Sequence, residues 1–137
     1  MKYSILTIAL FLFSFCSFGE KKQAEDAIDL RRSKGVDATI EAFIDVIKKN
    51  VKSQPDSSIY FNNEVEKFAQ ELNHKISDGI RSKLKFYRGI AKYHRGHYIE
   101  GRHYLEQSIK IEHRDSLDGE RYFYLALNHK NVGNYSQ

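Results

Sequence analysis

Apolar residues recur along this chain with the spacing of amphipathic helices. Ile40, Phe43, Ile44 and Ile47 lie at positions i, i+3, i+4 and i+7, which places four large side chains on one helical face. Four later groups have helical spacing: Val65, Phe68, Ala69, Leu72 and Ile76; Ile80, Leu84, Tyr87, Ala91 and His94; Tyr98, Gly101, Leu105, Ser108 and Ile109; and Tyr122, Leu125, Ala126 and His129. No stretch has a convincing strand pattern. The sequence therefore predicts an all-α fold, and because each helix has one apolar face, the helices must pack on one another.

Breaks in this pattern divide the chain into segments. A further helical stretch within residues 20–34 ends in basic residues before Gly35, which is a common signal for the end of a helix. The polar cluster at 53–58 contains the only proline and predicts a linker. We therefore expect an N-terminal helix pair at 20–52, followed after the linker by helical repeats at 59–137.

The N-terminus has the order of a secretory signal peptide. Lys2 is followed by an apolar run over residues 5–15 and then by small residues ending at Gly19, so we expect residues 1–19 to be cleaved off. A retained anchor is disfavoured, because even about fifteen apolar residues as a helix would cover about 22 Å of a hydrocarbon core about 30 Å thick. Lipid attachment at Cys16 is an alternative that would tether the protein to a membrane. Both routes predict an exported protein of the periplasm or cell envelope, secreted or associated with the outer membrane.

Two segments of the C-terminal half align without a gap. They are FYRGIAKYHRGHY at 86–98 and FYLALNHKNVGNY at 123–135, offset by 37 residues. The identical pairs are Phe86 and Phe123, Tyr87 and Tyr124, Gly96 and Gly133, and Tyr98 and Tyr135. Gly89 and Ala126 are both small at equivalent positions. A repeat of this length is typical of a helical solenoid.

Small and aromatic residues of this repeat resemble the pattern of the tetratricopeptide repeat family over residues 82–137. The positions that carry the resemblance are Gly89, Gly96, Tyr98, Gly101, Leu105 and Ser108, with Ala126, Gly133 and Tyr135 in the second copy. The resemblance implies antiparallel helix pairs stacked as a short right-handed solenoid that binds a protein or peptide. The chain departs from the family at Lys85 and Arg88, where the family has Trp and Leu, and at His113, where it has Pro.

The last repeat is incomplete, because the chain ends at Gln137, where its second helix should begin. A terminal cap should be polar on its outer face. Leu125, Leu127 and Val132 instead spread apolar groups around much of this helix. We therefore expect a truncated array, or one whose last face is completed by a partner.

Charge adds a candidate binding surface. The formal net charge is +4, which is too small to identify a partner, but basic residues are concentrated between residues 81 and 114. Two tyrosines within this segment fall off the main apolar stripes. The residues expected to line a groove for a protein or an acidic peptide are Arg88, Lys92, Tyr93, Arg95 and Tyr104. Export argues against nucleic acid as the partner.

Sequence motifs for chemistry are weak. The six histidines have no cysteine beside them after processing, and the turn at Gly96 separates His94 from His97, so we expect no metal site. The sequence contains neither a G-x-S-x-G elbow nor a G-x-x-x-x-G-K phosphate loop. We therefore expect no catalytic residues, no cofactor and no enzyme activity. A protein-binding adaptor is favoured, and a lipoprotein or a protein that binds anionic surfaces is the alternative.

Overall fold

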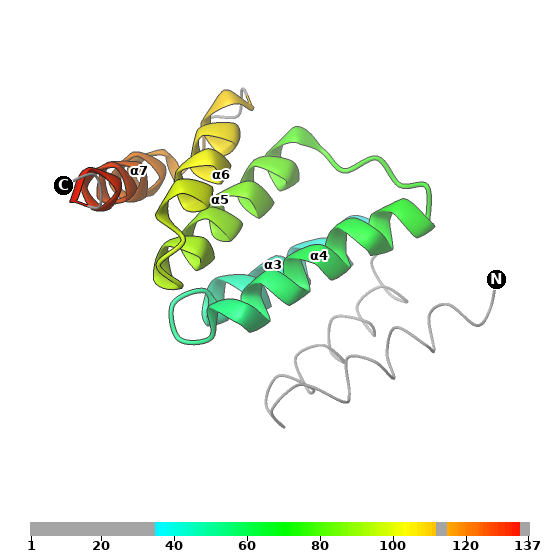
Figure 1. The fold of residues 1–137 in the computed structure, drawn as a ribbon. Coiled ribbons are helices and arrows are strands. Elements are labelled where there is room, and N and C mark those ends of the chain that lie inside the picture. Colours follow the sequence, from blue (N-terminus) through cyan, green and yellow to red (C-terminus); the bar gives the residue numbers. More distant parts are fainter. Residues whose placement is uncertain (1–34, 112–114, 135–137) are drawn as a thin grey trace. The chain divides into compact units, whose positions relative to one another are not determined.

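The computed structural model describes residues 35–111 and 115–134, and these form five helices (Figure 1). The helices are α3 (Val36–Asn50), α4 (Pro55–Glu71), α5 (Asp78–His94), α6 (Tyr98–Lys110) and α7 (Asp118–Asn134). The described residues contain no strand, which confirms the all-α prediction. Among these helices, none has both the length and the apolar character needed to cross a bilayer. The expected signal peptide, Cys16, His113 and Tyr135 lie outside the described residues.

The chain divides into two compact units, Met1–Val46 and Ile47–Gln137. In the first unit, Ile40, Phe43 and Ile44 are buried, as their helical spacing predicts. The second unit contains the last turn of α3 and the helices α4 to α7.

Helix α4 begins inside the segment expected to be a linker. Its first residue is Pro55, and proline suits the first helical turn because its missing N–H would have no partner there. The Ser58 hydroxyl donates to the carbonyl oxygen of Ile47 over 3.3 Å, which ties the start of α4 to the end of α3 within the second unit. The connection between the two helices is therefore limited to residues 51–54, shorter than the sequence predicts.

Two of the helices are followed by a residue with a left-handed backbone conformation. Gly96 follows α5 with φ of 78°, and the His97 N–H donates to the Lys92 carbonyl over 2.9 Å, which closes the last turn. Asn73 plays the same part after α4, with φ of 51°. The glycine turn expected between α5 and α6 is therefore present.

The two helices α5 and α6 run antiparallel and approach closely at two glycines. A β-carbon at Gly89 would lie 2.7 Å from Leu105 Cγ and 3.1 Å from the carbonyl oxygen of Gly101. A β-carbon at Gly101 would in turn lie 3.1 Å from the carbonyl oxygen of Gly89 and 2.6 Å from Asn128 Oδ1 of α7. The contact of α6 with α5 and the contact of α6 with α7 therefore both depend on glycine, which has no side chain.

Helix α7 packs mainly on α6 and also touches α5 (Figure 1). Its inward face consists of Arg121, Tyr124 and Asn128, which are 1, 6 and 0% exposed. Helical spacing predicts that the stripe from Tyr122 to His129 faces inward, and this prediction is wrong, because Tyr122, Ala126 and His129 are exposed.

The buried face of α7 instead carries Arg121, which donates to Ser82 and Ser108. The Tyr124 ring contacts Tyr93, and Asn128 lies against Gly101.

Candidate functional site

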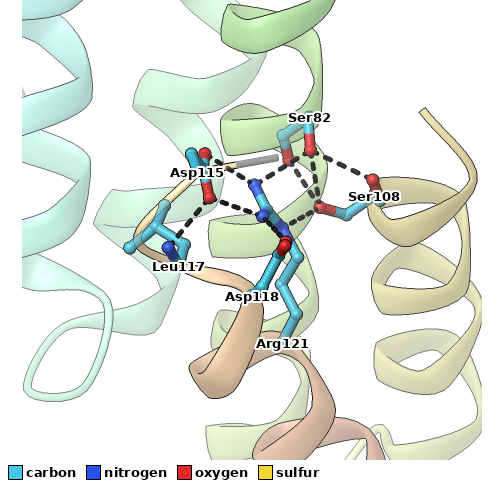
Figure 2. A network of polar contacts seen from close by, with 6 residues as sticks. All are labelled: Ser82, Ser108, Asp115, Leu117, Asp118 and Arg121. Carbon is cyan, nitrogen blue, oxygen red and sulfur yellow. Dashed lines mark hydrogen bonds and ion pairs between the residues drawn. The ribbon is translucent and has the colours of Figure 1, made fainter. Parts of the chain in front are cut away.

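Arg121 is a fully buried cation at the centre of a polar network that joins α5, α6 and α7 (Figure 2). Its Nε donates to the Ser108 hydroxyl over 2.8 Å, and its Nη2 donates to the Ser82 hydroxyl over 3.0 Å. Asp115 accepts from both terminal nitrogens, at 2.7 and 3.0 Å, and Asp118 accepts from Nη1 at 2.7 Å. The guanidinium thus connects three helices through directed hydrogen bonds.

The charge of Arg121 is maintained by its partners. Burial by itself lowers the pKa of the guanidinium, but hydrogen bonds and charge from Asp115, and then from Asp118, outweigh burial and raise the pKa above its ordinary value. The guanidinium carbon lies 5.6 Å from the centre of the Phe86 ring, which adds a cation–π contact. Because Arg121 has no exposed surface to offer a ligand, its role is to hold α7 in place.

The basic residues expected to line a groove each pair with a neighbouring helix. Arg88 is 8% exposed, and its Nη2 donates to Asn63 Oδ1 over 2.7 Å and to Glu66 Oε2 over 3.2 Å, both on α4. Lys92 Nζ lies 2.6 Å from Glu100 Oε2 of α6. These two cations of α5 therefore contribute to helix packing in the free protein.

Arg95, at the end of α5, pairs with Asp56 of α4 over 3.0 Å and is more exposed than Arg88 and Lys92. Glu100, the partner of Lys92, has a lowered pKa, chiefly because of the Lys92 hydrogen bond. The cationic row on α5 is thus matched by carboxylates on both flanking helices.

The two tyrosines of the expected groove lie in different surroundings. Tyr104 lies beneath the Arg88 guanidinium and the Lys85 ammonium, each 5.4 Å from its ring centre. Tyr93 instead contacts the rings of Tyr98 and Tyr124, with centres 5.5 and 5.7 Å away. The structure therefore brings Arg88 and Tyr104 together and places Tyr93 with an aromatic cluster, while partner binding by these residues stays a prediction.

The residues that carry the repeat also separate into two groups. Those of α5 and α6 that are buried include Gly89, Gly101, Leu105 and Ser108. Ala126 and Gly133 of α7 are exposed, although Ala126 corresponds to the buried Gly89.

The side of α7 that faces away from α6 is an uncovered surface with two large aromatic rings. We define the outer face of α7 as seven exposed residues with helical spacing: Gly119, Tyr122, Phe123, Ala126, His129, Lys130 and Gly133. Tyr122 is 60% exposed and Phe123 is 59% exposed. Among the described residues, the only other large apolar side chain with comparable exposure is Ile99, at 66%.

Only part of these sites is visible in the sequence pattern. Apolar spacing pointed to Tyr122 and Ala126 but assigned them to the interior. Arg121 gave no apolar signal, although the two acidic residues three and six positions before it were an indication of a buried ion pair.

Within residues 35–111 and 115–134, no cluster of three or more His, Cys, Asp or Glu side chains is placed to hold a metal ion.

Protein-family models, curated proteins and solved structures all give no match to the chain.

Proposed function

We propose that this chain is a helical protein-binding module, of the tetratricopeptide-like kind, that acts as an adaptor in the cell envelope. The observation that carries the proposal is the outer face of α7, where the consecutive residues Tyr122 and Phe123 are both exposed to solvent. Aromatic residues are enriched at the centres of protein interfaces because they bury a large area with few rotatable bonds.

The internal repeat supports this assignment. In the first copy, α6 covers Gly89, and Leu105 lies where any side chain at Gly89 would stand. In the second copy, the equivalent residue Ala126 is exposed. Among the described residues, no helix covers Ala126 as α6 covers Gly89, which favours a partner at this position.

The location in the envelope rests on the N-terminal sequence alone. Its basic, apolar and small segments predict removal of residues 1–19 during export. Mass spectrometry of the protein from its native host should find a mature chain that begins at Glu20. A chain that starts at a lipid-modified Cys16 would instead favour the membrane-tethered alternative.

Protein binding is tested directly by photocrosslinking in the native host. Phe123 is replaced by p-benzoylphenylalanine, an aromatic crosslinker of similar shape, and Gln70 on α4, which is also exposed, serves as the control position. We expect a protein adduct on irradiation from position 123 and none from position 70. Equal or absent adducts at the two positions would contradict the proposal.

A further inference from the structure

The outer face of α7 is self-complementary about Ala126. When two copies of α7 lie antiparallel and cross at this residue, residues before Ala126 meet residues after Ala126 on the other copy. At about 100° per residue, Tyr122 and His129 share one side of the face and Phe123 and Lys130 share the other, so Tyr122 meets His129 and Phe123 meets Lys130. An antiparallel pair would therefore set each aromatic ring against a histidine or a lysine, with glycine against glycine further out.

Small residues at the crossing allow close approach. Gly119, Ala126 and Gly133 recur every seven residues down the middle of the outer face. A β-carbon added at Gly119 or Gly133 would meet nothing within 4 Å, so both positions are open to an incoming helix. Gly89 and Gly101 show that this fold already pairs antiparallel helices through facing small residues.

Charge and aromatic character also match in this orientation. The aromatic rings lie in the N-terminal half of the face and the cationic or protonatable residues in the C-terminal half. Antiparallel pairing places Lys130 over the ring of Phe123, and the chain already places Lys85 and Arg88 over the ring of Tyr104, 5.4 Å from its centre. The opposed helix dipoles favour the same orientation.

We propose that the partner of this face is a second copy of the chain, joined by an antiparallel and symmetric pairing of the two α7 helices. The inference rests on the proposed function, because it assigns an occupant to the same surface. A 17-residue helix is about 25 Å long, so the paired area falls in the class below about 1,200 Å² that is typical of weak complexes. The dimer should therefore form at micromolar or higher concentrations.

A symmetric disulfide tests the crossing point. In the full-length protein with Cys16→Ser, the substitution Ala126→Cys places two sulfurs at the two-fold axis, where β-carbons about 4 Å apart suit a disulfide. With copper phenanthroline as oxidant, we expect covalent dimer to form about ten-fold faster than from the control Gln70→Cys, because pairing raises the effective concentration. Equal rates from the two variants would overturn the proposal.

The orientation is tested by mixing two further variants in the same background. Gly119→Cys and Gly133→Cys should crosslink to each other and only slowly to themselves, since position 119 faces 133 only when the helices are antiparallel. A size tag on one variant separates mixed from self dimers on a gel. Dominant self dimers from each variant would exclude the antiparallel arrangement.

Light scattering and crosslinking together distinguish a second copy of the chain from a different protein partner. Ala126→Glu should abolish the concentration-dependent dimer seen by light scattering, with the circular dichroism spectrum unchanged because residue 126 is exposed. If the unmodified chain is monomeric even at about 1 mM, well above the range of a weak interface, the second copy is excluded. A crosslink from position 123 to a different protein would then preserve the binding function, and its absence as well would remove both.

Discussion

Ser82 on α5 and Ser108 on α6 exchange hydrogen bonds, because each hydroxyl donates to the other residue's carbonyl oxygen, over 3.0 and 2.8 Å. Arg121 can only donate, so each hydroxyl must accept from the guanidinium and keeps its own proton for the facing carbonyl. The two hydroxyl oxygens also lie 3.1 Å apart, so the three side chains form one connected network. The position of α7 depends on this network.

Replacing Arg121 should strongly destabilise the fold. Arg121→Met removes the cation of this network and the hydrogen bonds that it donates to Asp115, Asp118 and both serine hydroxyls. Asp115 keeps the Leu117 N–H as a donor but loses the buried cation with which it pairs, so we expect a loss of about 3 kcal/mol in the free energy of unfolding. Urea denaturation followed by circular dichroism measures the change. Asp118→Asn is the matched control, and because Asp118 is half exposed and Asp115 remains, it should cost less than about 1 kcal/mol. A loss as large from the control would mean that Asp118 is the main partner of Arg121.

Glycine substitutions should separate the covered from the uncovered positions. Gly89→Ala and Gly101→Ala place a methyl group against Leu105 and Asn128, so each should cost about 1 to 3 kcal/mol of unfolding free energy. Gly119→Ala and Gly133→Ala meet open space, and alanine favours helix, so each should be neutral or stabilising by up to about 1 kcal/mol. Thermal unfolding at low protein concentration compares all four. Similar losses at all four sites would contradict the packing of α5 on α6 described above.

The ion pair between Arg88 and Glu66 should show charge reversal with rescue. Arg88→Glu places a carboxylate at a buried position beside Glu66, whose side chain is 40% exposed and partly screened by solvent, and we expect a loss of about 2 kcal/mol in unfolding free energy. Adding Glu66→Arg restores an opposite pair and should recover part of this loss. A double-mutant cycle from urea denaturation gives the coupling, and strictly additive effects would show that the pair contributes nothing.

Glu100 should make the fold less stable in acid. The Lys92 hydrogen bond is the largest cause of its lowered pKa, followed by an opposing effect of burial and by the charges of Lys92, His97 and Arg95. A lowered carboxyl pKa contributes stability that is complete above the ordinary value of 4.5 and is lost as pH falls through the lowered value. Lys92→Met should raise the pKa of Glu100 in an NMR titration and flatten the acid loss of stability. Lys110→Met, on the same helix, should leave it unchanged.

A second titration in the same direction belongs to His94. Partial burial, and then the charge of Lys52, lower its pKa from the ordinary 6.5, so its contribution is complete above pH 6.5 and is lost as pH falls through the lowered value. Lys52→Met should raise the pKa of His94 and reduce this loss. The ring proton shifts of His94 in the NMR spectrum report the change, and an unaltered titration would exclude Lys52 as a cause.

Helix spacing allowed the fold class to be predicted, and Gly96 indicated the turn between α5 and α6. These features depend on properties visible in a single sequence, namely apolar period and the absence of a side chain. The start of α4 at Pro55 was missed because proline and serine occur both in linkers and in first helical turns.

The orientation of α7 could not be predicted from apolar period. Its stripe at Tyr122, Leu125 and Ala126 is more apolar than the face that is buried. Asn128 Nδ2 donates to the Tyr124 carbonyl of the preceding turn, whereas its buried Oδ1 accepts no hydrogen bond. Arg121 is buried because partners on α5, α6 and the preceding loop satisfy its guanidinium. Such partners lie up to 39 residues away in sequence and become neighbours only after folding.

The facing glycines of α5 and α6 limit which second mutations can restore a damaged fold. When a larger residue appears at a helix crossing, the usual suppressor is a smaller residue opposite it. Gly89 and Gly101 leave nothing to remove from each other, since each already presents its backbone oxygen 3.1 Å from where the other's β-carbon would stand. Suppressors of Gly89→Ala must therefore arise at Leu105, and suppressors of Gly101→Ala must arise at Asn128. The two glycines are in contact, yet each depends on a different residue for a compensating mutation.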